Sequence, residues 1–317
     1  MRNLITGVAG FVGGHLARHL LDQGHTVAGI RYTKDRSEPP EHLPAEVEIH
    51  EADILDPSGL ARIVSGFEPE AIFHLAAFSN PQSSWENARR TLTTNIIGTE
   101  NLLQAATNSG VMPRVLLVGS GQQYGNVPEK DQPISEDCPQ RPLTPYAVSK
   151  SAQEILGLRF FLAEKLPVFL VRAFNHTGPG QEPFYVCSSF ARQVAEIEVG
   201  SRKPPIRVGN LEARRDFTDV RDVVRGYARV LESGKPGEPY NLCRGEAFSI
   251  QEILDKLVDL TGSQIPIEVD ASRYHAADAP LVLGNNTKLR SELGWEPEID
   301  LAETLRHLLD YWRNKIR

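Results

Sequence analysis

The chain has 317 residues, of which 24% are charged, and its formal net charge is −7. This length allows a large core and two lobes. The negative charge argues against nucleic acid as a partner, and no apolar run is long enough to cross a membrane.

The N-terminal residues predict a dinucleotide-binding turn. Residues 2–6 resemble a short strand, residues 7–13 form a glycine-rich turn, and a helical pattern of leucines follows. Gly7 permits a tight turn, Gly10 lets the backbone approach a phosphate, and Gly13 lets the helix pack on the strand. A pyrophosphate would bind at the N-terminus of this helix. We therefore assign Gly7, Gly10, Phe11, Val12 and Gly13 to the cofactor site.

The second strand, over residues 26–30, ends at Arg31. An NAD site usually carries an acid here for the ribose 2′-hydroxyl, whereas an arginine can receive a 2′-phosphate. Arg31, with Lys34 and Arg36 behind it, favours NADP(H), with NAD(H) as the other possibility. The alternative interpretation of these three residues is a solvated basic loop.

A third strand is expected over residues 47–50, and Asp53 and Ile54 follow it. From this position Asp53 could reach the adenine of the cofactor. It could equally cap a helix, because Pro57 and Leu60 follow.

Strand and helix patterns then alternate. Buried strands are expected over residues 71–77, 115–118 and 168–171, with helices over residues 86–109 and 146–165. This alternation predicts an α/β fold with a doubly wound parallel sheet of the Rossmann type. Gly7, Ala76, Ser120 and Asn175 would all lie at the carboxyl ends of strands, where such folds bind ligands.

The pattern of the sequence changes after residue 172, where prolines divide the chain into short segments. Residues 302–312 are expected to form an amphipathic helix at the end of the chain. We expect a smaller C-terminal α/β substrate lobe over the cleft. The predicted boundaries are 1–171 with 217–243 for the dinucleotide-binding domain, and 172–216 with 244–317 for the substrate domain.

Tyr146 and Lys150 are candidate catalytic residues. They are four residues apart, so both side chains lie on one face of the predicted helix. Thr144 and Pro145 are a typical N-cap and first-turn proline, which place Tyr146 near the positive end of the helix dipole. The ammonium and the dipole both favour the phenolate, so we expect the pKa of Tyr146 to fall. Such a phenol can transfer the proton that accompanies hydride transfer at a carbonyl.

Ser120 follows the strand at residues 115–118 and is the third catalytic candidate. A serine here could be no more than a turn residue. Opposite Tyr146, however, its hydroxyl could hold a carbonyl oxygen while hydride arrives from a nicotinamide.

The three cysteines, Cys138, Cys187 and Cys243, are scattered without metal-type spacing. They indicate free thiols in a reducing compartment, so we expect a cytoplasmic protein. A strand from residue 2 leads us to expect no signal or transit peptide. His15 and His19 share a helix face but have no third ligand in view, so no metal site is predicted.

Ordered motifs over nearly the whole chain resemble the extended short-chain dehydrogenase/reductase family. They are Thr6-Gly7-x-x-Gly10-Phe11-x-Gly13, His74-Leu75-Ala76-Ala77, Asn95-x-x-Gly98-Thr99, Ser120, Tyr146-x-x-x-Lys150, Arg215-Asp216-Phe217 and Leu293-Gly294-Trp295-x-Pro297. Residues 174–181 and 208–222 are similar to the branch of this family that modifies GDP-mannose.

The resemblance implies an oxidoreductase that reduces the 4-keto group of a GDP-4-keto-6-deoxyhexose with NAD(P)H and forms GDP-D-rhamnose. Tyr146 would be the acid/base, Lys150 would bind the nicotinamide ribose, and Ser120 would hold the 4-keto oxygen. The family motifs place Leu75, Ala76, Ala77 and Asn95 beside the cofactor. They place Ser79 near the hexose, Gln122, Asn175 and Asn210 with the sugar nucleotide, and Arg215 on its diphosphate. The resemblance also implies a homodimer built on the helices at residues 86–109 and 146–165.

Two departures from the family pattern bear on function. Dehydratases of this family carry an acid where this chain has Gln122, and an amide cannot act as that base. Members of the family also often carry an Arg-Pro-x-Asp/Glu element in the C-terminal lobe, whose arginine binds the phosphate. The nearest stretch in this chain is residues 273–278, in which Arg273 or His275 would take that role. Alternatives to the reductase are a redox-neutral 4-epimerase, a 4,6-dehydratase of the same family, and a non-catalytic nucleotide sensor.

Overall fold

A seven-stranded parallel sheet forms the centre of the larger lobe in the computed structural model, which describes residues 1–32, 43–270 and 279–317. The strand order is β10-β6-β5-β4-β1-β2-β3, and all neighbouring strands are parallel. The strands are β1 (Arg2–Thr6), β2 (Thr26–Arg31), β3 (Glu48–Glu51), β4 (Ala71–His74), β5 (Arg114–Ser120), β6 (Val168–Ala173) and β10 (Pro239–Leu242). The predicted parallel sheet is confirmed.

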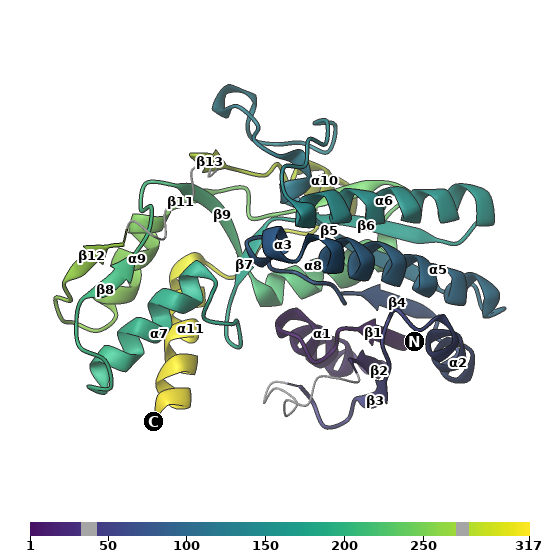
Figure 1. Cartoon of the computed structure of the whole chain (residues 1–317), viewed down its shortest axis with the longest axis horizontal. Coiled ribbons are helices and arrows are strands. Elements are labelled where there is room, and N and C mark those ends of the chain that lie inside the picture. Colours follow the sequence, from purple (N-terminus) through teal and green to yellow (C-terminus); the bar gives the residue numbers. More distant parts are fainter. Residues whose placement is uncertain (33–42, 271–278) are drawn as a thin grey trace.

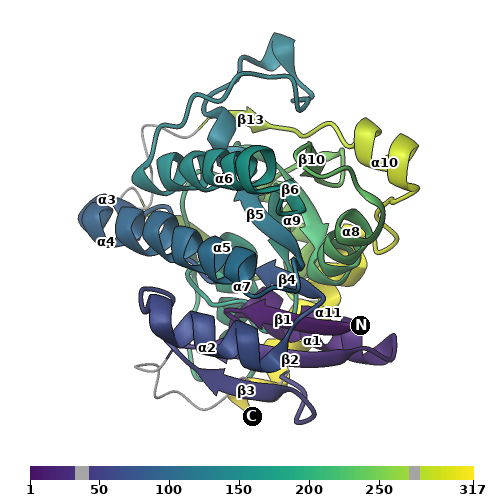
Figure 2. The ribbon, with the colours of Figure 1, turned by 90° about the vertical axis from the view of Figure 1, so that its right-hand side faces the viewer.

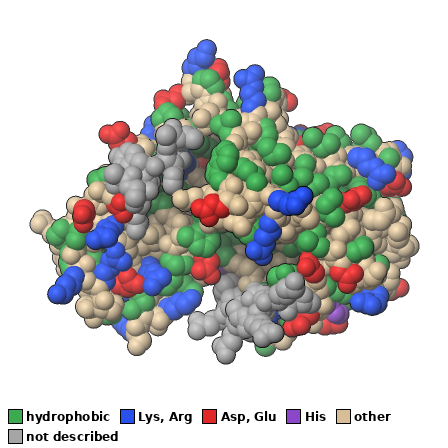
Figure 3. Space-filling view, in the orientation of Figure 1, with side chains coloured by type: hydrophobic (Ala, Val, Ile, Leu, Met, Phe, Trp, Pro, Cys, Tyr) green, Lys and Arg blue, Asp and Glu red, His purple; other side chains and the backbone are tan. Residues whose placement is uncertain are grey.

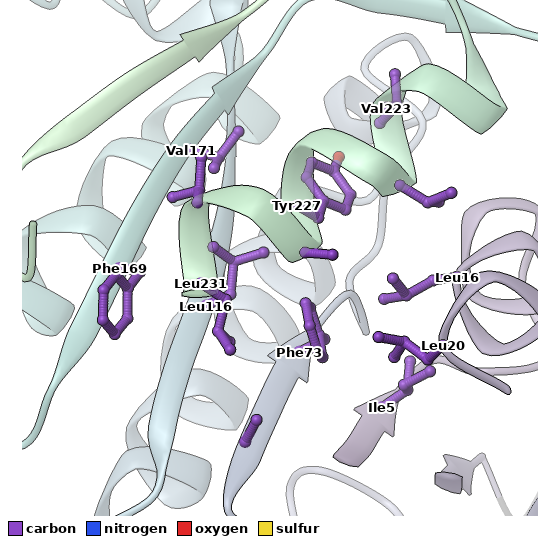
Figure 4. Close-up of a cluster of buried hydrophobic side chains, with 14 of the residues drawn as sticks. Ile5, Leu16, Leu20, Phe73, Leu116, Phe169, Val171, Val223, Tyr227 and Leu231 are labelled. Atoms are coloured by element: carbon purple, nitrogen blue, oxygen red, sulfur yellow. The ribbon is translucent and has the colours of Figure 1, made fainter. Parts of the chain in front are cut away.

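Helices cover both faces of this sheet (Figure 2). One face carries α2 (Pro57–Phe67), α5 (Gly98–Asn108) and α6 (Pro145–Glu164), and the other carries α1 (Phe11–Asp22), α8 (Val220–Ser233) and α10 (Thr287–Leu293). On the second face, Leu16 and Leu20 of α1 and Tyr227 of α8 pack with Phe73 and Leu116 of the sheet (Figure 4). Burying an apolar stripe of each helix against a parallel sheet is the main stabilising contribution in a doubly wound fold.

The smaller lobe lies beside the carboxyl ends of the strands (Figure 1). Its helices α7 (Val186–Glu198), α9 (Ile250–Asp259) and α11 (Leu301–Ile316) share one apolar core, to which Phe190, Leu254 and Leu308 contribute. Its strands are β7 (Asn175–Thr177), β8 (Ile206–Val208), β9 (Arg214–Asp219), β11 (Ala247–Ser249), β12 (Ile267–Val269) and β13 (Leu281–Val282). The predicted second lobe is therefore present, and its residue boundaries stay a prediction.

The helix predicted over residues 86–109 is wrong in detail. The segment divides into α3 (Ser83–Glu86), α4 (Ala88–Leu92), a π-helical turn (Thr93–Ile97) and α5. Asn87 separates the first two pieces with a φ of −116°, and its amide donates to the Ser83 carbonyl. In the π-helical turn Asn95 is buried and accepts a hydrogen bond from the loop after β4. The hydrophobic period of the sequence does not reveal such a local change of helix type.

The remaining differences are at element ends. Strand β4 stops at His74 rather than at residue 77, because the chain opens there into a loop. Helix α6 ends at Glu164, since Lys165 has a φ of +61° and terminates it. Among the described residues, no helix is both long and apolar enough to span a bilayer.

Candidate active site

A cleft of about 1250 Å³ runs along the carboxyl ends of the parallel strands, between the two lobes. Figure 3 shows the hollow from the side on which it opens. It is lined by residues of β2, β5 and β6, by the segments that follow β1, β3 and β4, and by residues from β7 to α7 and around β9. This is the position at which open α/β sheets bind their ligands.

Thirteen of the predicted cofactor residues line this cleft: Gly7, Gly10, Phe11, Val12, Gly13, Arg31, Asp53, Ile54, Leu75, Ala76, Ala77, Tyr146 and Lys150. Five of the six predicted substrate residues do so as well: Ser79, Gln122, Asn175, Asn210 and Arg215. Arg273, the sixth, lies outside the described residues, as do His275, Lys34 and Arg36.

The glycine turn forms an open cradle at one end of the cleft. Gly7 has a φ of +72°, and a Cβ built on it would lie 2.9 Å from the backbone of Ala76. A Cβ on Gly13 would overlap the carbonyl oxygen of Gly7. Helix α1 starts at Phe11, and its N-cap residue, Gly10, has no side chain to cap it, so the first N–H groups of the helix are available to an anion. This geometry fits a pyrophosphate.

Asp53 follows β3 and lines the cleft, and it does not cap a helix. Its carboxylate accepts from the Leu55 N–H at 2.9 Å, whereas Asp56 caps α2 by accepting from the Ser58 N–H at 3.1 Å. The alternative interpretation of Asp53 as a helix cap is therefore wrong.

Asn95 differs from the other predicted cofactor residues because it does not line the cleft. Its buried amide accepts from the Phe78 N–H at 2.7 Å and donates to the Ser149 hydroxyl at 2.9 Å. Ser149 in turn donates to the carbonyl of Tyr146 at 2.7 Å. Asn95 therefore braces the loop after β4 against the helix that carries Tyr146.

His74 braces the same loop from the sheet. Its Nδ1 lies 2.7 Å from Thr6 Oγ1, and its Nε2 lies 2.9 Å from Thr99 Oγ1. Thr99 donates its hydroxyl hydrogen to the Asn95 carbonyl, so Nε2 of His74 is the donor and Nδ1 the acceptor. Burial lowers the pKa of His74 to about 3, which matches a neutral imidazole. Thr6 can then accept from the Ala76 N–H at 3.1 Å.

The three catalytic candidates meet at the centre of the cleft. Tyr146 lies in the first turn of α6, where the Thr144 hydroxyl accepts from the Ala147 N–H at 3.0 Å and caps the helix. Tyr146 and Ser120 both line the cleft, and the Ser120 hydroxyl is close enough to the Tyr146 phenol to oppose a rise of its pKa. The Lys150 ammonium lies 6.0 Å from the centre of the Tyr146 ring and donates to the Val118 carbonyl at 2.8 Å.

Burial dominates the electrostatics of this group. Burial, followed by the neighbouring Tyr185, raises the pKa of Tyr146 above its ordinary range, and the nearby Ser120 hydroxyl opposes this rise. The expectation that this pKa falls is wrong for the structure described here. Withdrawal of the phenol from water outweighs the helix dipole, and the ammonium is turned toward Val118. Burial also lowers the pKa of Lys150 to about 7.

A buried polar network holds Ser120 against α6. Its N–H donates to the Gln123 amide oxygen at 2.6 Å, and the Gln123 NH₂ donates to Glu154 at 2.9 Å. Glu154 accepts two hydrogen bonds from Arg172, at 2.9 and 2.6 Å. Such a doubly bonded, buried pair specifies position strongly. It ties the loop of Ser120 to the helix of Tyr146 and Lys150.

The cleft lining also includes side chains that were not predicted from the sequence, and three of them carry polar groups from three different helical regions. Tyr185 precedes α7, Tyr227 comes from α8, and Arg90 comes from α4, with its guanidinium 5.1 Å from the centre of the Phe78 ring. None belongs to a motif with local spacing. Tyr227 in particular looks like an ordinary core residue of an amphipathic helix, and only the tertiary fold shows that it borders the cleft.

The family model described as GDP-mannose 4,6 dehydratase matches residues 4–308 of the chain. The chain belongs to the GDP-mannose 4,6-dehydratase family. A curated relative, the GDP-6-deoxy-D-mannose reductase of Pseudomonas aeruginosa, is 36% identical over 316 residues, which cover 100% of this chain and 98% of the relative. The UDP-glucose 4-epimerase of Mycolicibacterium smegmatis is 31% identical over 318 residues, which cover 99% of this chain and 99% of the relative.

Among solved structures, that of RMD from Pseudomonas aeruginosa complexed with NADPH superimposes with a TM-score of 0.87 at 34% identity, covering 99% of each chain. These matches place the whole chain in the GDP-mannose 4,6-dehydratase family. Because the relatives carry reductase and epimerase names, family membership alone does not choose between these activities.

The buried Lys150 should make the stability of the protein depend on pH. Its pKa is lowered to about 7 in the folded protein, whereas an unfolded lysine titrates near about 10.4. Between these values the unfolded chain binds more protons, so stability gains from Lys150 as pH rises, by up to about 1.4 kcal/mol per pH unit. We expect Lys150→Met to be more stable than the wild type at pH 7, by a margin that shrinks toward pH 10.

Urea denaturation at pH 7, 8, 9 and 10 measures this margin, with the exposed Lys130→Met as the control. A constant difference between wild type and Lys150→Met across this window would contradict the prediction.

Proposed function

We propose that this protein reduces the 4-keto group of a GDP-4-keto-6-deoxyhexose with NADPH and so forms GDP-D-rhamnose. The observation that carries the proposal is the meeting of Ser120, Tyr146 and Lys150 at the centre of one cleft whose end is an open glycine cradle. The full-length similarity to a GDP-6-deoxy-D-mannose reductase supports the choice of substrate.

The chain's own residues account for carbonyl reduction. Ser120 and Tyr146 would both hydrogen-bond the keto oxygen, which orients the carbonyl and stabilises negative charge on it. The raised pKa of Tyr146 keeps the phenol protonated at neutral pH, so it can donate its proton to that oxygen. The bound nicotinamide would supply the hydride that ends on C4. The alcohol product then carries one hydrogen on C4 and one on oxygen, and Tyr146 is reprotonated from solvent.

Gln122 and Gln123 support a reductase over a dehydratase. Gln122 lines the cleft at the position of the dehydratase acid, and its N–H donates to the Ser120 hydroxyl at 3.2 Å. Gln123 is fully buried and bonded to Ser120 and Glu154. Neither amide can abstract a proton, which elimination of water requires.

A 4-epimerase remains the second candidate, because epimerisation needs no such acid and a UDP-glucose 4-epimerase is 31% identical. Such an enzyme would retain NAD through many turnovers. Release of NAD on denaturing the purified protein, together with interconversion of sugar-nucleotide epimers, would support it. A non-catalytic sensor is disfavoured, because the chain keeps both Tyr146 and Lys150 in the cleft.

The substrate roles follow from position. Asn175, Asn210 and Arg215 line the cleft on the side of the smaller lobe, and we assign them to the sugar nucleotide, with Arg215 on the diphosphate. For the cofactor we favour NADP(H), because Arg31 ends β2 and lines the cleft where a 2′-phosphate would lie. All three cysteines are free, which agrees with the cytoplasmic location that we propose.

We also propose a homodimer built on α6 and its neighbours. Val148, Ile155 and Leu162 are spaced by seven residues on α6 and are exposed, Ile155 to 65%. Ile97 and Trp85, from the adjoining segment, are exposed too, and Figure 3 shows hydrophobic side chains on this side, over α3 to α6. An apolar stripe of this kind on a helix suits a second copy of the same face.

The proposed function makes three predictions, of which the first is activity itself. With enzymatically prepared GDP-4-keto-6-deoxymannose, the wild type should oxidise NADPH and produce a GDP-deoxyhexose. Tyr146→Phe removes the proton donor and should lower kcat by about 10²–10⁴-fold. Loss of reduced-nicotinamide absorbance measures both, with Tyr311→Phe on α11 as the control. Equal rates for wild type and Tyr146→Phe would rule out the proposed mechanism.

The second prediction concerns cofactor choice. Arg31→Ala should raise the KM for NADPH about tenfold, because a charge-assisted contact to the 2′-phosphate is lost, and leave the KM for NADH within about twofold. Arg18→Ala, which removes an exposed arginine of α1, is the matched control. An equal loss with both cofactors would contradict a 2′-phosphate contact.

The third prediction concerns assembly. Ile155→Glu places a charge in the centre of the proposed interface, so the variant should be monomeric in light scattering coupled to size exclusion, whereas the wild type is dimeric. The control is Leu143→Glu, because Leu143 is also exposed but lies before α6. This variant tests whether a new charge at any exposed apolar residue has the same effect. A monomeric wild type would overturn the proposal.

A further inference from the structure

Gln153 contacts Lys150 from the same helix. It lies three residues after Lys150 on α6, and its amide oxygen accepts from the Lys150 ammonium at 3.0 Å. The Val118 carbonyl, near the end of β5, accepts from the same ammonium at 2.8 Å. Gln153 is buried and does not line the cleft. Any effect that it has on a bound ligand is therefore exerted through Lys150.

The chemistry of the two groups fixes the direction in which this amide points. An ammonium can only donate hydrogen bonds, so the oxygen of Gln153 faces it and the NH₂ faces away. That NH₂ is buried, and within the described residues it has no hydrogen-bond partner. Gln153 also borders a gap, shared with Leu117, Leu170 and Val171, that is too small to hold water. A glutamine at this position therefore costs free energy on its donor side and contributes through its oxygen.

The charged and titratable groups around Lys150 do not replace this acceptor. Glu154, four residues after Lys150, forms an ion pair with Arg172 of β6 at 2.6 Å. His74 of β4 is neutral, because burial and then the charge of Lys150 lower its pKa to about 3. Tyr146 is protonated, since burial raises its pKa. In the described part of the chain, two neutral oxygen atoms and no carboxylate therefore accept from this ammonium.

The third hydrogen of the ammonium is left for a ligand. An ammonium has three donors, two of which are taken by Val118 and Gln153. Lys150 lines the cleft, and its nitrogen lies 6.0 Å from the centre of the Tyr146 ring. Burial lowers the pKa of Lys150 to about 7, so at neutral pH its immediate surroundings decide whether it is charged. Loss of an acceptor of the charged form lowers that pKa further.

We propose that Gln153 is a positioning residue for the reaction, whose amide oxygen holds the Lys150 ammonium charged and in place beside Tyr146. A charged Lys150 stabilises the phenolate that Tyr146 becomes when it gives up its proton. The proposed reduction is therefore fastest with this hydrogen bond intact. The kinetic consequence rests on the proposed function, whereas the effect on the charge of Lys150 does not.

Carbon-13 NMR of the full chain, labelled at the ε-carbon of lysine, measures the charge of Lys150 without turnover. A pH titration follows each lysine, and the signal that is missing from Lys150→Met identifies Lys150. Gln153→Met keeps a similar side-chain volume and removes the amide acceptor, so the titration midpoint of Lys150 should fall by about one pH unit. Gln153→Glu places a carboxylate at the same point and should raise this midpoint. Either variant alone decides the inference, because the two expected shifts have opposite signs.

Gln193→Met is the matched control. Gln193 is also buried, on α7 of the smaller lobe, and exchanges two hydrogen bonds with the backbone of Arg207, at 3.2 and 2.9 Å. Its replacement should destabilise the protein and leave the midpoint of Lys150 unchanged. A wild-type midpoint in a Gln153 variant, or an equal fall in Gln193→Met, would overturn the inference.

Steady-state kinetics of carbonyl reduction test the consequence for the reaction. If the rate follows the charged fraction of Lys150, kcat of Gln153→Met should be about tenfold below the wild type at about pH 8 and only about twofold below it at about pH 6. Acid does not rescue a merely structural loss, so a constant ratio across pH would contradict the positioning role.

Failure of the proposed function has a different signature. In that case the wild type would oxidise no NADPH with the keto-sugar, while the NMR midpoints of Lys150 in the wild type and in Gln153→Met would still differ.

Discussion

The parallel register of the central sheet is the constraint on which the rest of the structure depends. Thr6 lies beside His74 across β1 and β4, and Ser120 lies beside Ala173 across β5 and β6. Because every strand runs the same way, the loops that follow them open on one edge. The glycine cradle, the Ala76 loop and Ser120 come from separate parts of the chain and meet there for this reason alone.

Around this edge, buried polar contacts convert approximate proximity into a defined geometry. Asn95 and His74 brace the loop after β4, and the Gln123–Glu154–Arg172 network ties Ser120 to α6. Removal from water makes each of these contacts costly to leave unmade. The same burial keeps Tyr146 protonated and weakens the charge on Lys150. Position and proton affinity in this site thus have a common physical origin.

Much of the site could be predicted because its signals are local. A Gly-x-x-Gly-x-x-Gly turn after a strand, a Tyr-x-x-x-Lys pair behind an N-cap, and Arg31 at a strand end each need only a few neighbouring residues. The side chains whose surroundings were not predicted depend on distant partners. Asn95 looked like a cofactor contact but faces Ser149. Tyr185 belongs to no local pattern, and only the folded chain brings it to the cleft wall opposite the loops of the larger lobe.

The sequence by itself determined the alternation of strands and helices, the doubly wound sheet and the chemical type of the central group, because hydrophobic period, capping and glycine spacing act within a few residues. Only the tertiary structure decided that Tyr185 and Tyr227 line the cleft, that the segment at residues 83–108 breaks into short helices, and that the pKa of Tyr146 rises. Burial is a property of the assembled chain. Desolvation therefore outweighed the local charges and dipole from which the sequence had indicated a fall.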